Sequence, residues 1–551
     1  MIKLKLRTIL LIIPLISFTI FASILYVNRT QYYNYYERIK FESAGATLYA
    51  NFYHPAKQLP FQDKHPLVIY AHGHGWQKDV DIRSVIELTK RGFFVAALDY
   101  QGHGESGGAL DNVDSMGVPA LAQDCINLLD TIENLNIYSE KINASQIGLL
   151  GHSLGGMVVL MNGARDPRFS ATISWAGVVN ASLFEWDVGA YNPVNLINTT
   201  TPKNLLIIHS KSDAVVDYEK HALVARDLTG CPIVNITDSL ISAHFLISDQ
   251  VLIETINWYE ATFFGSESIN GEIYFSWPLM FLFMLLTLIS MCFLVFSIMI
   301  VISSYILRKQ NRESLESIPD EQNTSAKKNG LKFLISLLLY VGFWFGMIQL
   351  FELSAIYVVP LVIILGYFVF KTINFFGIKK QKLDIASIKS IIKSQINPWY
   401  FLYSFISSAI FLGFYYVISL TYPWSLFYPP SILAFLGSFI IFPLYLSTEI
   451  FYRKILYPFS EFTKYRKMRT LLIAFIILVF HIYLVYVSFI YSEGPALIAS
   501  FSALLMSSAM NCVIYHKTKN FSNALLNSII INGMFFGSTV PVLVSLLISL
   551  F

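Results

Sequence analysis

The carboxyl-terminal half of the chain consists mostly of apolar runs that are long enough to cross a lipid bilayer. About eight such runs follow Trp277, in a chain of 551 residues of which 55% are hydrophobic and 14% are charged. This composition requires that much of the chain face lipid rather than water. We therefore predict a polytopic helical membrane domain at 273–551, with spans at 277–307, 333–350, 353–370, 399–420, 432–446, 471–490, 496–515 and 524–551.

Another apolar run, at 8–27, follows Lys3, Lys5 and Arg7 near the amino terminus. Its length fits either a signal peptide or a first spanning helix. No small-residue cleavage site follows it before the polar stretch that begins at Asn28. We therefore favour a retained signal-anchor helix within 1–34.

Between these apolar parts, charged residues, glycine and proline return over 35–265. Continuous short apolar runs are typical of strands that are buried on both faces of a parallel sheet. Helical patterns lie between most of the runs, which predicts an α/β domain with a mostly parallel, doubly wound sheet. The predicted strands are 67–71, 94–98, 147–150, 171–175, 205–209 and 232–236, and the predicted helices are 80–91, 120–135, 154–164 and 218–228.

Lysine and arginine predict the orientation, because short cytoplasmic loops retain them. After Trp277 they fall in alternate loops, whereas the opposite loops carry at most one glutamate each. The basic residues before the first run also belong inside. We expect a multi-pass protein of the cell membrane with the amino terminus inside and both the 35–265 domain and Phe551 outside. The basic loops are 308–328, 371–393, 453–469 and 517–519.

The strongest chemical signal is the segment Gly151-His-Ser-Leu-Gly155. It directly follows the apolar run at 147–150 and directly precedes a helical pattern. In such a strand-turn-helix setting, glycines permit a strained turn that lifts a serine hydroxyl above the sheet, at the positive end of a helix. We therefore predict Ser153 as a nucleophile.

A serine hydroxyl needs a base, and the base needs an acid that orients it. Both follow Ser153 in the chain order of hydrolases that use such a turn: Asp213 in the loop after the strand at 205–209, and His244 before the last helix of the domain. Asp217 is the alternative acid. We favour Asp213, because Asp217 is placed to cap the helix that follows it.

Acyl transfer also needs donors for the negative charge that develops on the carbonyl oxygen. The predicted donors are the backbone N–H groups of Leu154 and of His74, the second in a glycine-rich loop. The alternative is that His72 and His74 bind a metal. We disfavour it, because no carboxylate or third histidine lies close in the sequence.

Composition and cysteine spacing argue against other classes. A net charge of +3 is too small to indicate a nucleic-acid surface. Only Cys125 and Cys231 lie outside the apolar runs, without the short spacing of metal ligands. We expect no nucleic-acid partner, no cofactor and no metal. The expected partners are membrane lipid and a small-molecule, lipid or peptide substrate.

Together, the motifs over about 38–264 resemble the α/β-hydrolase superfamily, in its serine-aminopeptidase-like and dienelactone-hydrolase-like branches. The resemblance implies a serine hydrolase of carboxylic esters or peptides, with an acyl-enzyme intermediate. It implies a structural role for 99–107, and therefore no catalytic role for His103. It also implies a short lid at 178–203, whose aromatic residues either line a substrate pocket or close the surface. These are Phe184, Trp186 and Tyr191.

The membrane half weakly resembles the CAAX-protease-like family, through the segment at 449–453 and His481. That family pairs two glutamates with two histidines. Here Thr448 stands at the place of the first glutamate and Ser528 at that of the second histidine. We favour the alternative that Glu449 and Arg453, one helical turn apart, form a structural pair.

Two functions other than an outer serine hydrolase stay open. In one, the membrane half transports or senses a ligand and the outer domain is a binding module. In the other, Glu449 and His481 carry out intramembrane proteolysis. We favour the hydrolase, because a decayed site would have lost at least one of Ser153, Asp213 and His244.

Overall fold

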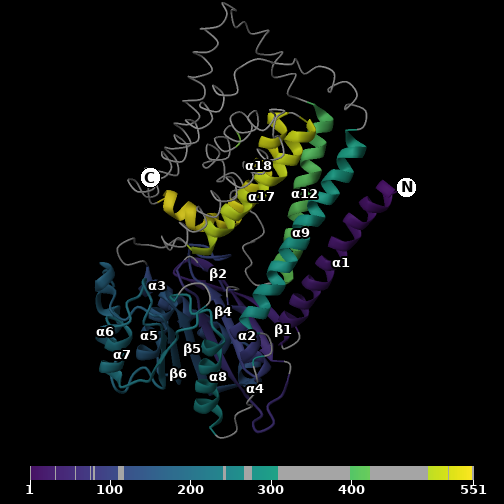
Figure 1. Cartoon of the computed structure of the whole chain (residues 1–551). Coiled ribbons are helices and arrows are strands. Elements are labelled where there is room, and N and C mark those ends of the chain that lie inside the picture. The colour runs from purple at the N-terminus through teal and green to yellow at the C-terminus, as the bar shows by residue number, and fades with distance from the viewer. Residues whose placement is uncertain are drawn as a thin grey trace, which may run out of the picture. The chain divides into compact units, whose positions relative to one another are not determined.

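The computed structural model describes two compact units (Figure 1). One contains Ser17–Leu288, and the other includes Ile289–Tyr416 and Pro429–Val540. The boundary therefore falls within two long helices, α1 (Ile2–Thr30) and α9 (Trp277–Ile306). The described residues are 2–30, 33–55, 57–74, 76–78, 81–108, 117–239, 243–265, 273, 276–307, 397–421, 449, 494–518 and 520–548.

The first unit contains an eight-stranded sheet in the order β1-β2-β4-β3-β5-β6-β7-β8. Strand β2 is antiparallel to both β1 and β4, and the other neighbouring pairs are parallel. The predicted α/β class is therefore confirmed. The strands are β1 Tyr33–Ser43, β2 Ala46–Pro55, β3 His65–Ala71, β4 Phe94–Asp99, β5 Ile142–His152, β6 Ala171–Trp175, β7 Leu205–His209 and β8 Ile233–Asn235.

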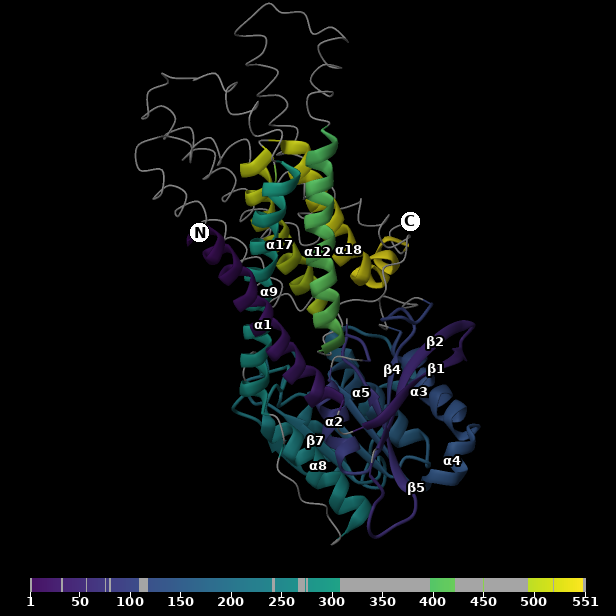
Figure 2. The same ribbon diagram turned by 90° about the vertical axis from the view of Figure 1, so that its right-hand side faces the viewer.

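Helices cover both faces of this sheet (Figures 1 and 2). Side chains of α3 and α5 share one core cluster with one face of the strands, and side chains of α2 and α8 share a second cluster with the other face. Successive residues of a strand point to opposite faces, so Ile69 enters the first cluster and Tyr70 the second. The helices are α2 Ile82–Lys90, α3 Val118–Glu133, α4 Asn136–Lys141, α5 Leu154–Arg165, α7 Ala222–Thr229 and α8 Asp249–Phe264.

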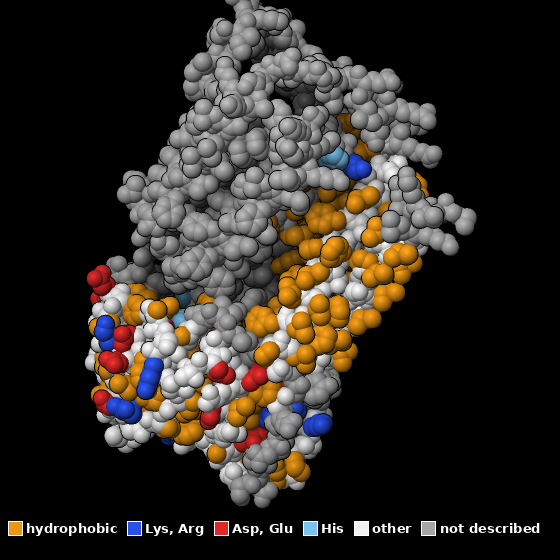
Figure 3. All heavy atoms as spheres, viewed as in Figure 1, with side chains coloured by type: hydrophobic (Ala, Val, Ile, Leu, Met, Phe, Trp, Pro, Cys, Tyr) orange, Lys and Arg blue, Asp and Glu red, His pale blue; other side chains and the backbone are white. Residues whose placement is uncertain are grey.

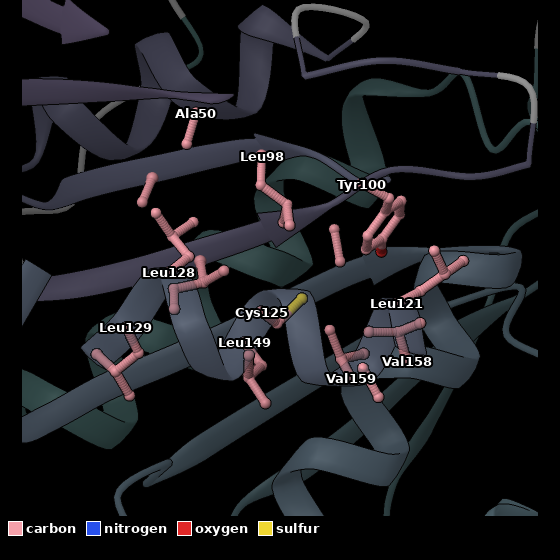
Figure 4. Packing of buried hydrophobic residues seen from close by; sticks show 14 of the residues in the cluster. Ala50, Leu98, Tyr100, Leu121, Cys125, Leu128, Leu129, Leu149, Val158 and Val159 are labelled. Carbon is pink, nitrogen blue, oxygen red and sulfur yellow. The ribbon is translucent and has the colours of Figure 1, made fainter. Parts of the chain in front are cut away.

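The core on the α3 and α5 face is apolar and closely packed (Figure 4). Leu98 and Leu149 of the sheet lie in the same cluster as Leu128 of α3 and Val159 of α5, and all four are fully buried. Burying a leucine or valine side chain stabilises a fold by about 1.5–3 kcal/mol. This core holds β5 and α5 together, and the turn between them carries Ser153.

Some element boundaries differ from the prediction. The patterns did not indicate β1 and β2, which form a hairpin through Ala44 and Gly45, both at positive φ. The helix predicted at 218–228 begins at Ala222, because turns occupy 218–221. The strand predicted at 147–150 extends to Ile142–His152.

Long apolar helices cover the run at 8–27 and four of the eight predicted runs after Trp277. Among the described residues, three windows are long and apolar enough to cross a membrane: Thr8–Asn28, Pro278–Ile306 and Pro398–Ile418. The other predicted runs, the basic loops at 308–328, 371–393 and 453–469, and their sidedness lie outside the described residues. The remaining long helices are α12 Pro398–Thr421, α17 Gly494–Thr518 and α18 Phe521–Ile548.

Candidate active site

Ser153 occupies the turn between β5 and α5, with φ 55° and ψ −115°. A non-glycine residue rarely adopts positive φ, and the surrounding structure must hold it there. Close packing does so: a Cβ on Gly151 would lie 2.2 Å from the Gly155 carbonyl oxygen, and a Cβ on Gly155 would lie 2.0 Å from that of Ala71. The two glycines therefore let the strand, the turn and the helix approach closely. The predicted strand-turn-helix arrangement is present.

His244 bridges Ser153 and Asp213 with its two ring nitrogens. Its Nε2 lies 3.0 Å from the Ser153 Oγ, and its Nδ1 lies 2.8 Å from the Asp213 Oδ2. A carboxylate only accepts hydrogen bonds, so we assign the proton to Nδ1. Nε2 then carries a lone pair that accepts from the serine hydroxyl. The structure thus brings the three predicted residues into one hydrogen-bonded chain.

Asp213 is held as a charged group by backbone and side-chain donors. Its Oδ1 accepts from the N–H groups of Val215 at 2.8 Å and Val216 at 3.0 Å. Its Oδ2 also lies 3.4 Å from the Nε2 of His209. Burial raises the pKa of the Asp213 carboxyl, but the hydrogen bonds from His209, His244 and the backbone outweigh burial and lower it. Asp213 is therefore ionised at neutral pH.

The alternative acid, Asp217, is exposed and forms a local contact instead. Its Oδ1 accepts from the N–H of Lys220 at 2.9 Å. This hydrogen bond lowers the pKa of Asp217. Asp217 caps a turn, as predicted, although the helix itself begins later, at Ala222. Asp213, not Asp217, contacts His244.

The two predicted oxyanion donors belong to different segments, the start of α5 and the loop after β3. Leu154 is the first residue of α5, where backbone N–H groups have no partner within the helix. His74 lies in the loop after β3. That loop packs against the turn, because a Cβ on Gly73 would lie 3.0 Å from the His152 Nδ1 and 3.5 Å from the Ser153 Cβ.

Sequence reasoning missed two residues that support His244. The Nε2 of His152 lies 2.8 Å from the backbone oxygen of His244, and the ring of Trp76 stacks on His152 at 4.8 Å. Burial lowers the pKa of His152 to about 3, so the ring stays neutral. The position of His152 directly before Ser153 was the one feature of the sequence that could have indicated a role for it. Its contact with His244 depends on the conformation of the loop that carries His244.

The segment at 99–107 has the structural role that its resemblance implied. The buried Asp99 carboxylate accepts from the backbone N–H groups of Lys78 at 2.7 Å and Glu105 at 3.0 Å, and it pairs with the Lys78 ammonium. His103 is buried, with Nδ1 3.1 Å from the Gln101 carbonyl oxygen, and burial lowers its pKa to about 3. Within the described residues, no group of three or more His, Cys, Asp or Glu residues is placed to hold a metal ion.

The predicted lid at 178–203 is short and helical in places, with η1 Ala181–Phe184, η2 Gly189–Tyr191 and α6 Pro193–Leu196. Its aromatic residues pack against the core cluster of the α3 and α5 face. Phe184 stacks on Trp186 with 5.0 Å between ring centroids. These contacts support the alternative in which the segment closes the surface of the domain.

Comparison with known proteins finds a family match that includes the Ser153 turn. Residues 62–195 match the family described as serine aminopeptidase, S33. The domain has the α/β-hydrolase fold. The uncharacterised protein YfhR of Escherichia coli K12 is 26% identical to this chain over 198 residues, which are 33% of this chain and 65% of YfhR.

Two relatives with named activities match this chain over shorter stretches. A 2,6-dihydropseudooxynicotine hydrolase of Paenarthrobacter nicotinovorans is 31% identical over 174 residues, which are 30% of this chain and 42% of that protein. A monoacylglycerol lipase of Mycolicibacterium smegmatis is 31% identical over 123 residues, which are 22% of this chain and 41% of the lipase. The chain thus spans less than two thirds of the length of each of these relatives.

In the other unit, Glu449 is buried among amide and hydroxyl groups of the long helices. Its Oε1 accepts from the Nδ2 of Asn511 at 2.6 Å and from the Oγ of Ser528 at 3.2 Å. Asn527 donates to the Oδ1 of Asn511 at 2.7 Å, and Ser408 donates to the Oδ1 of Asn527 at 2.7 Å. The network joins α12, α17 and α18 through polar side chains.

The residues of the weaker resemblance are described only in part. Thr448, Arg453 and His481 lie outside the described residues, so the pairing of Glu449 with Arg453 stays a prediction. Ser528, which stands at the place of a family histidine, is a hydrogen-bond donor to Glu449. Two of the neighbours that bond Glu449 are the amide of Asn511 and the hydroxyl of Ser528, neither of which accepts protons readily.

Proposed function

We propose that the hydrolase-fold domain is a serine hydrolase that acts through an acyl-enzyme intermediate. Ser153 attacks the substrate carbonyl carbon while the Nε2 of His244 takes its proton. The backbone N–H groups of Leu154 and His74 hold the oxyanion. The bond to the leaving group then breaks as His244 returns the proton to it. Water repeats the sequence on the acyl-enzyme, which releases the acid and restores the hydroxyl of Ser153.

One observation carries this proposal: His244 lies within hydrogen-bond distance of both Ser153, at 3.0 Å, and Asp213, at 2.8 Å. A general base must reach the proton that it removes, and the 3.0 Å between the His244 Nε2 and the Ser153 Oγ supports this role. When His244 takes the proton from Ser153, its ring becomes a cation. The lowered pKa of Asp213 keeps its carboxylate negatively charged beside Nδ1, and this charge stabilises the cation.

We propose carboxylic esters as the first class of substrate to test, ahead of peptides. Two of the relatives are named a hydrolase and a monoacylglycerol lipase, and the second name denotes an ester substrate. The matched family is described as an aminopeptidase, so peptides are the second class. The chemistry of Ser153 serves both classes, because each step acts on an acyl carbonyl.

We also propose that the domain is anchored in a membrane and faces away from the cytoplasm. The apolar windows Thr8–Asn28 and Pro278–Ile306 directly precede and follow it, and each is long enough to span a bilayer. The basic residues before the first window support an inside position for the amino terminus. One span would then carry the chain outward before the domain folds.

Labelling with a fluorophosphonate tests the proposed function. The probe reacts with an activated serine, so membranes that contain the full chain should show one labelled band that Ser153→Ala abolishes. The same membranes should hydrolyse a short-chain p-nitrophenyl ester, and Ser153→Ala should remove this activity. Labelling that survives Ser153→Ala would show that the nucleophile has been assigned wrongly. A folded wild-type chain with neither labelling nor ester hydrolysis would favour a binding module.

A further inference from the structure

The loop that carries His244 packs against the two apolar helices that flank the domain. Ile247 is buried in a cluster with Leu25 of α1 and Met280 of α9. We call this the anchor cluster. The residues packed against it are Phe245, Phe281, Phe283 and Met284.

Alternate residues of this loop point in different directions. Leu246 is buried in the core on the α2 and α8 face of the sheet, whereas Phe245 and Ile247 belong to the anchor cluster. Leu246 also has a positive φ of 52°. The loop after His244 is therefore held between the core of the domain and the flanking helices.

The anchor cluster lies close to the ends of both predicted spans. Leu25 precedes the end of the window Thr8–Asn28 by less than one turn, and Met280 follows the start of the window Pro278–Ile306 by less than one turn. With a rise of about 1.5 Å per residue, both positions fall within about 5 Å of a span end. In a bilayer this depth is close to the boundary between hydrocarbon and headgroups.

Apolar side chains continue along the outer faces of the same two helices. On α1, Ile20 and Val27 are 51% and 52% exposed, and on α9, Leu282 and Leu285 are 49% and 54% exposed. Figure 3 shows hydrophobic side chains gathered over the long helices, and most of the charged side chains on the α/β part. Exposed apolar area on this scale is stabilised by lipid acyl chains rather than by water.

An aromatic path joins the anchor cluster to the reacting atoms. The ring of Phe245 lies 6.2 Å from the ring of His244 and 5.6 Å from that of Trp76. Trp76 stacks on His152, which directly precedes Ser153. Ring contacts therefore connect the anchor cluster to His244 and to the residue directly before Ser153.

We propose that the substrate is an amphiphilic ester that keeps its acyl chain in the bilayer while its carbonyl reaches Ser153. This inference rests on the proposed function. The headgroup region on each side of the hydrocarbon core is about 5–8 Å thick, and lipid esters lie at its inner edge. The anchor cluster holds the His244 loop at that level. An ester of this kind reaches Ser153 while its acyl chain stays in the membrane. A small soluble ester has no such chain, so the position of the His244 loop at the headgroup level does not improve its binding.

The test uses the full chain reconstituted in phosphatidylcholine vesicles. Hydrolysis of a monoacylglycerol with a long acyl chain, present in the vesicle, is compared with that of its short-chain, water-soluble counterpart. We expect kcat/KM to favour the long-chain ester by about tenfold or more, because binding energy from the remote chain is used at the reacting carbonyl. The rate should also fall when the ester is diluted with inert lipid, at a constant bulk concentration.

Two variants of α9 separate the anchor cluster from general effects on the helix. Met280→Ala removes a cluster residue, and Leu282→Ala removes an exposed residue two positions later. Met280→Ala should reduce the preference for the long-chain ester by about tenfold while short-chain hydrolysis stays within about twofold. Leu282→Ala should change neither rate.

The wild-type comparison decides the inference even where a variant fails to fold. If the chain labels with a fluorophosphonate but hydrolyses the short-chain ester as well as the vesicle-bound one, the inference is wrong and the proposed function stands. If the reconstituted chain neither labels nor hydrolyses either ester, the proposed function itself is wrong, and the inference that rests on it is wrong too.

Discussion

The Nε2–H of His152 donates a hydrogen bond to the backbone oxygen of His244, at 2.8 Å. It joins the residue directly before the nucleophile to the residue that acts on the nucleophile. Burial lowers the pKa of His152 to about 3, so the ring is neutral at the pH at which a serine hydrolase works, and the acceptor at Nε2 assigns its one proton to that nitrogen. Stacking on the Trp76 ring limits the orientation of the His152 ring. His152 is therefore a positioning residue for His244.

Removing this donor should slow the reaction without abolishing it. His152→Phe retains an aromatic ring against Trp76 but cannot donate, so we expect kcat to fall by about 10- to 100-fold with little change in KM. His152→Gln retains an N–H donor and should recover part of the loss. Initial rates with a short-chain ester, measured from pH 5 to 9, also show whether the acidic side of the pH–rate profile shifts. Wild-type rates and an unchanged pH profile in His152→Phe would contradict the positioning role.

The three bridged residues should act as a unit. Ser153→Ala or His244→Ala should lower kcat by about 10⁶, and the double variant should be no worse than either single one. Asp213→Asn should lower kcat by about 10⁴-fold, because the amide favours the wrong tautomer of His244 and no longer stabilises its cation. Single-turnover rates of purified variants measure these losses.

Asp217→Asn is the matched control for the acid. Asp217 is exposed and its side chain accepts from the N–H of Lys220, remote from His244, so the rate of Asp217→Asn should stay within about twofold of wild type. A large loss in Asp217→Asn together with a silent Asp213→Asn would overturn the acid assignment but leave the enzyme proposal intact.

The parts of the site that follow chain order were predictable, and those that depend on loop packing were not. The strands at Ala171–Trp175 and Leu205–His209 match their predicted bounds, because continuous apolar runs end where burial ends. Asp213 follows the second of these strands at the carboxyl edge of a parallel sheet, where Ser153 also lies. Their proximity therefore followed from the fold class.

The hairpin of β1 and β2 escaped prediction because both strands contain tyrosines, and because β1, the edge strand of the sheet, is also rich in charged residues. Its side chains do not form the continuous apolar run of a buried strand. The bond between His152 and His244 escaped for a different reason. The two residues lie 92 positions apart, and a single histidine gives no signal of which carbonyl it reaches.

Acid should destabilise the hydrolase-fold domain through its buried histidines. Burial lowers the pKa values of His72, His103 and His152 to about 3, whereas an unfolded histidine has a pKa of about 6.5. The unfolded chain therefore binds more protons below pH 6.5. The stability from each neutral ring is fully present above pH 6.5 and is lost as the pH falls towards 3, by up to about 1.4 kcal/mol per pH unit.

Thermal unfolding of the full chain in detergent, followed between pH 7.5 and 4.5, measures this loss. We expect the melting temperature of the domain to fall steadily below pH 6.5, and the fall to be shallower in His103→Gln by about the share of one histidine. His103 has no proposed catalytic role, so the variant should retain ester hydrolysis. A melting temperature that is independent of pH over this range would show that the buried rings are protonated in the folded domain as readily as in the unfolded chain, either in place or through local opening of the domain.

Glu449→Gln should leave ester hydrolysis within about twofold of wild type, because no proposed catalytic step uses Glu449. The amide oxygen of glutamine still accepts from Asn511 and Ser528, so the network should also survive. Glu449→Leu leaves these donors with one acceptor fewer and should destabilise its unit by about 1–3 kcal/mol. Rates and thermal unfolding of the two variants separate chemistry from stability. A large loss of esterase rate in folded Glu449→Gln would show that the membrane half takes part in the reaction.

Protease accessibility tests the proposed orientation, since Lys3, Lys5 and Arg7 place the amino terminus inside and one span then leads outward. Protease added to intact cells should remove the hydrolase-fold domain and its fluorophosphonate label, because the domain lies between the windows Thr8–Asn28 and Pro278–Ile306. A tag at the amino terminus should survive the same treatment. Reversing the charges of the three basic residues should reduce the exposed fraction of the domain. Digestion that occurs only after the membrane is breached would place the domain inside and reverse the topology.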